Sequence, residues 1–243
     1  MIDLALGDAH VVFTDRHGGV SAAPFDTANL GDHVGDEPAS VVENRNRLAR
    51  SVAEQLRGVS PDPQEWVWLH QVHGADVVAL DRAPSALPEA DAAVTSRECL
   101  PLVVLVADCA PIALAAPGAI GVVHAGWAGL ERGVIERAVT EVRGRGGDPV
   151  RAALGPCIHP ASYEFGSALL ARLVDRLGSA VAGRTADGRP ALDVPAGVRA
   201  ALRAVGVEDI LDIDVNTATS PDHFSARLEG TTGRQGVVVV RTR

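Results

Sequence analysis

Three short polar segments that follow or close apolar stretches carry the side chains best suited to chemistry. LHQVHG contains His70 and His73, VADCAP contains Cys109, and VVHAGWAG contains His124. Imidazole and thiolate together suit zinc, and a catalytic zinc commonly takes three protein ligands and leaves a fourth position for water. We therefore predict that His73, Cys109 and His124 bind one zinc ion, which would activate a bound water or polarise a substrate oxygen.

The spacing of these ligands leaves a second interpretation open. They lie far apart along the chain, unlike a compact Cys-x-x-Cys knuckle, and free cysteine is among the most often buried residue types. A buried Cys109 beside two hydrogen-bonded core histidines is the alternative. Two features favour the metal: Asp108 could orient a ligand or shuttle a proton, and Gly126 and Gly129 open the backbone just after His124.

The remaining histidine and thiol groups near these segments receive simpler interpretations. His70 lies three residues before His73, a spacing that points it away from the metal on a strand or turn. Cys99 and Cys157 have no neighbouring ligand pattern and are expected to be core or incidental thiols.

Hydrophobic periodicity predicts the helices that position these segments. Apolar residues recur at helical spacing over 38–56, with Asp36 as the N-cap and Gly58 as the stop. A second helix is expected from near Leu130 to the glycines at 144, 146 and 147. Further helices are expected at 167–177 and 195–205.

Short β-type runs separated by turn-like residues predict hairpins and a mixed sheet. The stretch 182–190, rich in Gly, Arg and Asp, is expected to be an exposed loop. No internal repeat or long linker divides the chain, so we expect one domain. The expected strands are 10–14, 67–69, 77–80, 92–94, 102–106, 112–115, 120–124 and 237–240.

Bulk composition excludes several classes of protein. The 243 residues carry a formal charge of −9, and no run of Lys or Arg forms a patch that could bind nucleic acid. Neither a signal peptide nor 18 consecutive apolar residues is present, so a membrane partner is not expected. Three cysteines fit a reducing compartment. We predict a cytoplasmic protein and leave the choice between monomer and homodimer open.

Several ordered motifs extend over nearly the whole chain and resemble the signatures of one family. The family is that of the multicopper polyphenol oxidase (laccase)-like proteins of YfiH type. The motifs are FTDRHGGVSAAPFDTANLGDHVGD at 13–36, Asn44 with Arg45, QVHGADVV, ADCAPIAL, HAGWAG, LGPCIHPASYEFG at 154–166 and HFSARLEGTTGRQG at 223–236.

The resemblance implies a fold and an activity. The fold would be α+β, a single domain over 1–243 built as a layered α/β/β/α sandwich with mixed sheets. The activity would be zinc-dependent phosphorolysis of adenosine, inosine, guanosine or methylthioadenosine, together with hydrolytic deamination of adenosine. Substrate partners would be a small nucleoside and phosphate. Copper is the less favoured metal.

The resemblance also assigns roles to residues and shows departures from the family pattern. Asp108, Cys109 and His73 would be catalytic. Ala128 stands where the family usually has Arg, Asn216 stands in place of its Cys, and Leu228 in place of its second Arg. These departures concern the anion site, for which Arg16, Arg45 and Arg227 are the candidates in this chain. The residues expected to contact substrate are Arg16, His17, Arg45, Trp127 and Arg227, and the aromatic residues that could stack on a purine or pack in the core are Trp127, Tyr163 and Phe224.

Three other functions remain open. A metal-free cysteine hydrolase could use Cys109 as nucleophile with His124 or His73 as base, acting on an amide such as a peptidoglycan precursor. A polyphenol oxidase (laccase) would need several coppers and paired His-x-His motifs, which the eight histidines do not provide. A binding or scaffold protein with a structural zinc would close all four metal positions with protein ligands.

Overall fold

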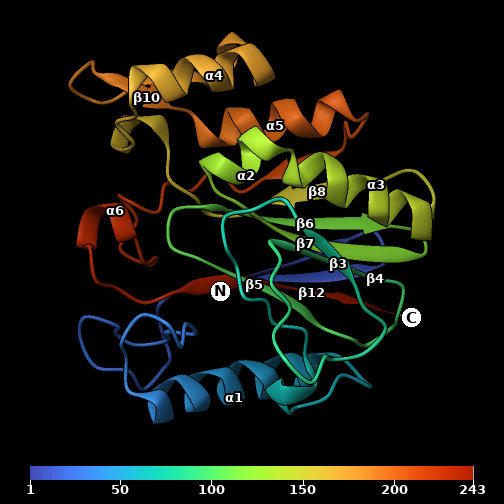
Figure 1. Ribbon diagram of the computed structural model, residues 1–243. Coiled ribbons are helices and arrows are strands. Elements are labelled where there is room, and N and C mark those ends of the chain that lie inside the picture. The colour runs from blue at the N-terminus through green and yellow to red at the C-terminus, as the bar shows by residue number, and fades with distance from the viewer. Residues whose placement is uncertain (243) are drawn as a thin grey trace.

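Two β-sheets lie face to face between layers of helices (Figure 1). The computed structural model describes residues 1–242. One sheet has four strands in the order β1-β2-β12-β5, and every neighbouring pair in it is antiparallel. Its strands are β1 (Ile2–Leu6), β2 (Ala9–Phe13), β5 (Leu102–Val106) and β12 (Gln235–Arg241).

The second sheet has six strands in the order β11-β8-β6-β7-β4-β3 and is mixed. The outermost pairs at its two edges, β3 with β4 and β11 with β8, are parallel. The central pairs are antiparallel, with the β6–β7 hairpin in the middle. Its strands are β3 (Val77–Ala79), β4 (Ala92–Thr95), β6 (Ala110–Ala116), β7 (Ala119–Ala125), β8 (Arg151–Leu154) and β11 (Ile210–Asp212).

Helices cover the outer face of each sheet (Figure 1). α1 (Pro38–Gln55) lies against the four-stranded sheet, whereas α2 (Trp127–Arg132), α3 (Val134–Gly146) and α5 (Val194–Ala204) lie against the six-stranded one. α4 (Ser167–Leu177) packs on α2 and α5 farther from the sheet, and the short α6 (Ala226–Glu229) lies apart from them near the end of the chain.

Three layers of buried apolar side chains hold the sandwich together, because each interface removes hydrocarbon from water. The α1 layer includes Leu48 and Trp66, and the layer between the sheets includes Phe13 and Leu102. The layer beneath α2–α5 includes Ile112. The predicted α/β/β/α sandwich with mixed sheets is confirmed. The domain boundaries 1–243 stay a prediction, and Arg243 lies outside the described residues.

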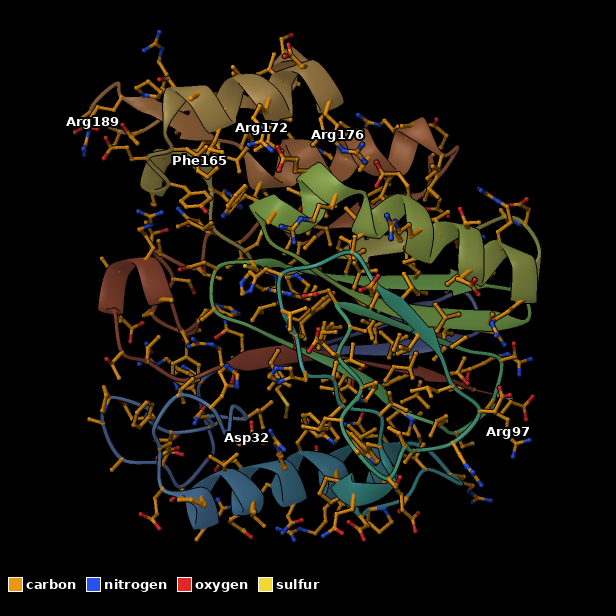
Figure 2. The ribbon with its side chains drawn as sticks, in the orientation of Figure 1. Asp32, Arg97, Phe165, Arg172, Arg176 and Arg189 are labelled. Atoms are coloured by element: carbon orange, nitrogen blue, oxygen red, sulfur yellow. The ribbon has the colours of Figure 1, made fainter. Side chains whose placement is uncertain are left out.

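Ion pairs join the outer helices to one another. Arg172 of α4 lies 2.7 Å from Glu131 of α2, and Arg176 of α4 lies 2.7 Å from Glu136 of α3 (Figure 2). These contacts align α4 over the two helices that follow β7. Among residues 1–242, none of the helices combines the length and the apolar character that a bilayer crossing needs.

The helix predictions hold with two corrections. The expected second helix is two helices, because Gly133 takes a left-handed conformation with φ of 82° and separates α2 from α3. Asp36 does not cap α1: Glu37 occupies the N-cap position, and Asp36 accepts a hydrogen bond from the Glu37 N–H instead. Helical periodicity continues across Gly133, so it could not reveal the break.

The strand predictions hold for the central strands and fail at the margins. The run 67–69 forms only an isolated bridge through Val67 to Leu102. The expected loop at 182–190 contains the paired strands β9 (Ala182–Arg184) and β10 (Pro190–Leu192). β1, β8 and β11 were not predicted, and the last two have only four and three residues.

Candidate metal centre

The β6–β7 hairpin positions two of the three predicted ligands. Cys109 lies directly before β6, and His124 is the penultimate residue of β7, where its Cα pairs with that of Pro111. Antiparallel pairing therefore brings Cys109 and His124 to the same end of these two central strands. His73 reaches this end of the two strands from the loop that precedes β3.

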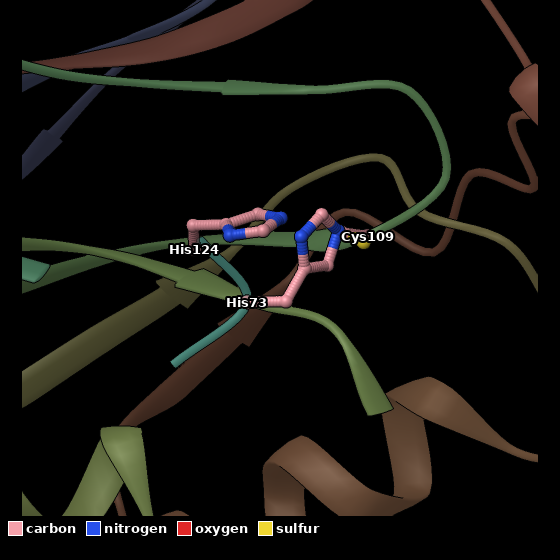
Figure 3. Close-up of side chains that lie close together, drawn as sticks. All are labelled: His73, Cys109 and His124. Atoms are coloured by element: carbon pink, nitrogen blue, oxygen red, sulfur yellow. The ribbon is translucent and has the colours of Figure 1, made fainter. Parts of the chain in front are cut away.

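The three ligand side chains converge on one point (Figure 3). One ligand atom from each of His73, Cys109 and His124 lies within 4.8 Å of the other two. The imidazole rings meet edge to face, with centroids 4.8 Å apart and an interplanar angle of 81°. Within residues 1–242 this is the single cluster of three or more His, Cys, Asp or Glu ligands with such spacing.

Asp91, a fully buried carboxylate directly before β4, connects both histidines. Its Oδ1 lies 2.7 Å from Nδ1 of His124, which leaves Nε2 of that ring for a metal or a proton. The carboxylate also accepts hydrogen bonds from the backbone N–H groups of Val72, His73 and Gly74, at 3.3, 3.0 and 2.6 Å. One side chain thus orients one ligand and fixes the backbone of another.

The electrostatics of the cluster favour a thiolate beside charged imidazole. Burial alone would raise the pKa of the Cys109 thiol, but the charges and hydrogen bonds of His124 and His73 lower it from 9.0 to about 6. Burial alone would lower the pKa of His124, but the Cys109 thiolate and the Asp91 carboxylate raise it from 6.5 to about 9. The donor set of one thiolate and two imidazoles fits zinc.

One glycine and two residues with unusual backbone dihedral angles lie at the predicted ligands. A Cβ atom added to Gly126 would lie 3.0 Å from Cδ2 of His73 and 3.1 Å from Sγ of Cys109, so a larger residue there would press on both side chains. His73 and Asp108 adopt positive φ values of 56° and 94°. Such conformations cost energy for residues other than glycine and concentrate at functional sites.

Asp108 connects the cluster to the C-terminal part of the chain. Its Oδ1 accepts a hydrogen bond from the Thr217 hydroxyl at 2.7 Å, and its Oδ2 accepts one from the backbone N–H of Arg227, also at 2.7 Å. Asp108 is buried, with 8% of its surface exposed. Both oxygens are therefore engaged in holding α6 and the Thr217 loop beside Cys109.

A cavity of about 560 Å³ is lined by all three members of the cluster. This volume lies within the range of small-molecule sites. Its wall includes Trp127, Tyr163 and Arg227. Trp127 and Tyr163 both pack edge to face on Phe165, with centroid distances of 5.9 and 5.5 Å, and the Arg227 guanidinium lies 4.8 Å above the Tyr163 ring. The cavity thus has an aromatic wall and a cationic rim.

The family of the chain follows from comparison with known proteins. The model of a family described as multi-copper polyphenol oxidoreductase laccase matches residues 10–242. The chain belongs to this laccase family. The match covers the six-stranded sheet, the four-stranded sheet apart from β1 and the first residue of β2, and all three members of the His-Cys-His cluster, and it confirms the predicted family resemblance.

Several bacterial proteins of similar sequence are named purine nucleoside phosphorylase. The chain is 44% identical over 238 residues to a purine nucleoside phosphorylase of Streptomyces griseus, covering 94% of this chain and 92% of that protein. It is 45% identical over 233 residues to a purine nucleoside phosphorylase of Streptomyces coelicolor, covering 93% of each. The purine nucleoside phosphorylase YfiH of Shigella flexneri is 39% identical over 224 residues, covering 90% of this chain and 88% of that one.

Solved structures share the fold. YlmD from Geobacillus stearothermophilus superposes with a TM-score of 0.87 at 32% identity, covering 98% of this chain and 93% of that one. A Neisseria meningitidis protein superposes with a TM-score of 0.87 at 28% identity, covering 98% and 96%. The layered sandwich is therefore shared with these two proteins.

In this laccase-family chain, three residues predicted to contact substrate lie outside the cavity wall. Arg16 forms an ion pair with Glu229 at 3.1 Å and lies over the Phe224 ring. The exposed His17 lies 2.8 Å from Asp222.

Arg45 is held by other groups as well. It donates to the Leu30 carbonyl at 2.9 Å, pairs with Asp32 at 3.3 Å and covers the Trp68 ring. Of the five predicted contact residues, Trp127 and Arg227 line the cavity. The roles assigned to all five stay predictions.

The other thiols and several unpredicted residues complete the site. Cys157 is buried, and burial raises the pKa of its thiol well above the ordinary value, as expected for a core cysteine. His70 lines the cavity without joining the ligand cluster. Sequence reasoning missed Asp91, Gln71 and Arg234. Gln71 anchors the His73 loop, because its side-chain amide bonds both the N–H and the C=O of Leu105 at 2.7 Å.

Proposed function

We propose that this laccase-family protein is a zinc-dependent purine nucleoside phosphorylase. The observation that carries the proposal is the convergence of His73, Cys109 and His124 at a cavity of about 560 Å³. The curated relatives named purine nucleoside phosphorylase, 44–45% identical over more than nine-tenths of the chain, support the substrate class.

The proposed reaction transfers a ribosyl group to phosphate. A phosphate oxygen forms a bond to the ribose carbon that bears the base, the bond from that carbon to the purine nitrogen breaks, and the departing purine takes up a proton. Zinc, when bound by His73, Cys109 and His124, would supply Lewis-acid polarisation beside the reacting atoms. The chain itself must bind the purine, place the phosphate and deliver the proton.

The aromatic wall suits a purine ring. Trp127 and Tyr163 present flat apolar faces that are held in place by Phe165. Burial, reinforced by the nearby Cys109 charge, raises the pKa of the Tyr163 phenol, so its hydroxyl stays protonated at neutral pH and can donate a hydrogen bond to a purine nitrogen. Arg227, stacked on Tyr163, adds positive charge at the same wall.

Asp108 remains the proposed acid beside Cys109, and its contacts also suggest a positioning role. Both of its oxygens accept hydrogen bonds, from Thr217 and from the Arg227 backbone. Delivery of a proton from Asp108 would therefore require one of these bonds to lengthen. Replacement of Asp108 by Asn tests both roles, because a positioning role raises the KM for nucleoside whereas an acid role lowers kcat.

The reaction is tested with the zinc-loaded protein and adenosine. Incubation with phosphate is expected to yield adenine and ribose 1-phosphate, and omission of phosphate is expected to stop adenine release. Hydrolytic deamination, the second activity that we propose, would yield inosine with or without phosphate. Absence of both adenine and inosine under zinc saturation would overturn the proposed function.

A specific observation favours one other candidate, a cysteine hydrolase acting on an amide. Cys109, His124 and Asp91 form a chain of contacts that resembles, in that order, a nucleophile, a base and an orienting carboxylate. This chemistry needs a free thiolate, which a bound zinc would occupy. One tightly bound zinc per protein molecule would exclude the hydrolase, whereas a metal-free protein that forms an acyl-thioester would support it.

Three free cysteines fit a reducing compartment, and we propose that the reaction takes place in the cytoplasm. A polyphenol oxidase needs several coppers, and the described residues hold one three-ligand cluster. That activity is therefore the least favoured of the candidates.

A further inference from the structure

We propose that Arg234 binds a phosphate group in the cavity. The location of this phosphate site follows from the geometry of Arg234, whereas the reaction of the bound phosphate rests on the proposed function. Arg234 lies in the segment between α6 and β12, directly before β12 begins at Gln235. It lines the same cavity as Cys109 and the aromatic wall. The ligand chemistry is that of a tetrahedral oxyanion with two or more accepting oxygens.

The backbone on both sides of Arg234 fixes its side chain in advance. Its N–H donates to Oδ1 of Asn29 at 2.9 Å, and its carbonyl accepts from the Leu30 N–H at 3.0 Å. Its Nη1 donates to the carbonyls of Thr232 and Gly233 at 3.0 and 2.9 Å. An arginine held in this way loses little conformational freedom on binding, so the binding energy is not spent on ordering it.

The guanidinium of Arg234 has no anionic partner among residues 1–242. No carboxylate lies within ion-pair distance of it, whereas Arg16 and Arg45 are paired with Glu229 and Asp32. Its Nε and Nη2 donate to no acceptor in the described part of the chain, although both nitrogens can form charged hydrogen bonds. A partly buried cation without a counter-ion favours an anion from solution.

The surroundings of Arg234 suit a phosphate more than a carboxylate side chain of a protein partner. His33 lies at the rim of the same cavity and can donate a further hydrogen bond. Arg227 lines the cavity as well, stacked on Tyr163. The cavity volume of about 560 Å³ accommodates a nucleoside with a small anion beside it.

Partial burial lowers the pKa of the Arg234 guanidinium, which remains charged at neutral pH because a guanidinium is a very strong base. The negative charges of Cys109 and Asp108 act in the opposite direction. Asp108 has both oxygens occupied by Thr217 and by the Arg227 backbone, so it does not serve as a direct counter-ion for Arg234.

The test measures binding of inorganic phosphate to the zinc-loaded protein by calorimetry. The wild type is expected to bind phosphate, and Arg234→Gln is expected to weaken this binding about 10- to 100-fold, the loss for one hydrogen bond to a charged group. Arg234→Lys keeps the charge but loses the planar fork, so its loss is expected to be smaller. The matched control is Arg97→Gln, because Arg97 is exposed and lies at the edge of the molecule away from α6 (Figure 2).

Two further experiments show whether the phosphate belongs to a nucleotide or is inorganic, and whether the Arg234 site exists independently of the proposed activity. If a nucleotide supplies the phosphate, AMP binds more tightly than adenosine to the wild type, and this difference disappears in Arg234→Gln. If inorganic phosphate is the ligand, the phosphate KM rises in Arg234→Gln while the adenosine KM stays within about twofold. Phosphate binding without any adenine release would contradict the proposed function but would still support a phosphate site at Arg234.

Two results would overturn the inference. One is a wild-type protein that binds neither phosphate nor AMP at millimolar concentration. The other is equal phosphate affinity in the wild type, Arg234→Gln and Arg234→Lys, with thermal unfolding showing that the variants are folded. The second result would assign any bound phosphate to the metal or to Arg227 instead.

Discussion

Asp91 is the residue through which the two histidines of the metal centre are coupled. It bonds the His124 ring and accepts the backbone N–H of His73, so its loss changes the ring orientation and the loop at once. Carboxylates that orient metal-bound imidazoles contribute about 10- to 100-fold in metal affinity. We expect Asp91→Asn to weaken zinc binding by that factor, as measured by competition with a chromophoric chelator.

The matched control for that variant is Asp76→Asn. Asp76 is exposed and lies 3.8 Å from Arg137, so its replacement removes a surface contact that contributes little. Zinc affinity of the Asp76 variant should equal that of the wild type. Equal affinity of the Asp91 variant and the wild type would show that Asp91 is not needed to orient His124.

The thiol of Cys109 should titrate in the metal-free protein at an unusually low pH. Its pKa of about 6 means that the thiolate dominates above pH 6, whereas an ordinary thiol with a pKa of 9.0 would still be protonated at neutral pH. We expect the iodoacetamide alkylation rate of zinc-stripped Cys99→Ser protein to reach half its maximum near pH 6. Added zinc should protect the thiolate, and a midpoint above pH 8 would contradict the structure.

Residue types point to the three predicted ligands but not to the groups that support them. His73, Cys109 and His124 are recognisable because few side chains bind zinc, and each follows or closes an apolar run. Asp91 is separated from His124 by 33 residues and stands in an unremarkable acidic and alanine-rich stretch. Arg234 lies next to a β-strand, where a surface arginine is common. Only the fold brings Asp91 to His124 and Arg234 to the cavity.

At the scale of elements, the β6–β7 hairpin and the start of α2 form a tight frame around the ligands. Gly126 caps α2 with φ of −80°, which alanine also adopts, so its replacement tests space and not backbone strain. An added Cβ would lie 3.0 Å from His73 and 3.1 Å from Cys109. We expect Gly126→Ala to cost about 1–3 kcal/mol, as in overpacked cores, and to lower zinc affinity by calorimetry.

Gly144 provides the comparison on α3. It is exposed, and a Cβ there would meet no atom within 4 Å. Gly144→Ala should therefore leave zinc affinity unchanged and raise stability by about 0.5 kcal/mol, because alanine loses less backbone entropy than glycine in a helix. Unchanged zinc affinity in both glycine variants would remove the steric role proposed for Gly126.

The elements that were predicted and those that were missed differ in a physical way. Strand 102–106 is marked by a continuous apolar run and helix 38–56 by apolar residues at helical spacing, and both patterns depend on local sequence. The break at Gly133 depends on one residue with positive φ inside a continuous apolar stripe. β8 and β11 are short and pair in parallel with each other, so their pairing depends on α4 and α5, which lie between them in the chain.

At the scale of the whole molecule, we expect the fold to form without a metal. Three apolar layers join α1, the two sheets and α2–α5, and the metal cluster lies at one edge of the six-stranded sheet. Removal of zinc should therefore leave the protein folded but less stable. At free zinc of 100 times its Kd, binding adds about 2.7 kcal/mol, which corresponds to about 5–10 °C in Tm for a chain of this size.

Circular dichroism and thermal unfolding of chelator-treated protein check this expectation. The far-ultraviolet spectrum should keep its shape, and Tm should return to the original value when zinc is restored. Loss of the spectrum on zinc removal would mean that the metal is structural, as in small zinc domains, and would favour a scaffold over an enzyme.

The central claim is that His73, Cys109 and His124 together bind one zinc ion at the cavity. Elemental mass spectrometry on the natively purified protein tests it most directly. We predict about one zinc per chain for the wild type and less than a tenth of that for His73→Ala, Cys109→Ser and His124→Ala, each shown to be folded. Zinc retained in full by any of these variants, or a wild type that binds no zinc, would contradict the claim.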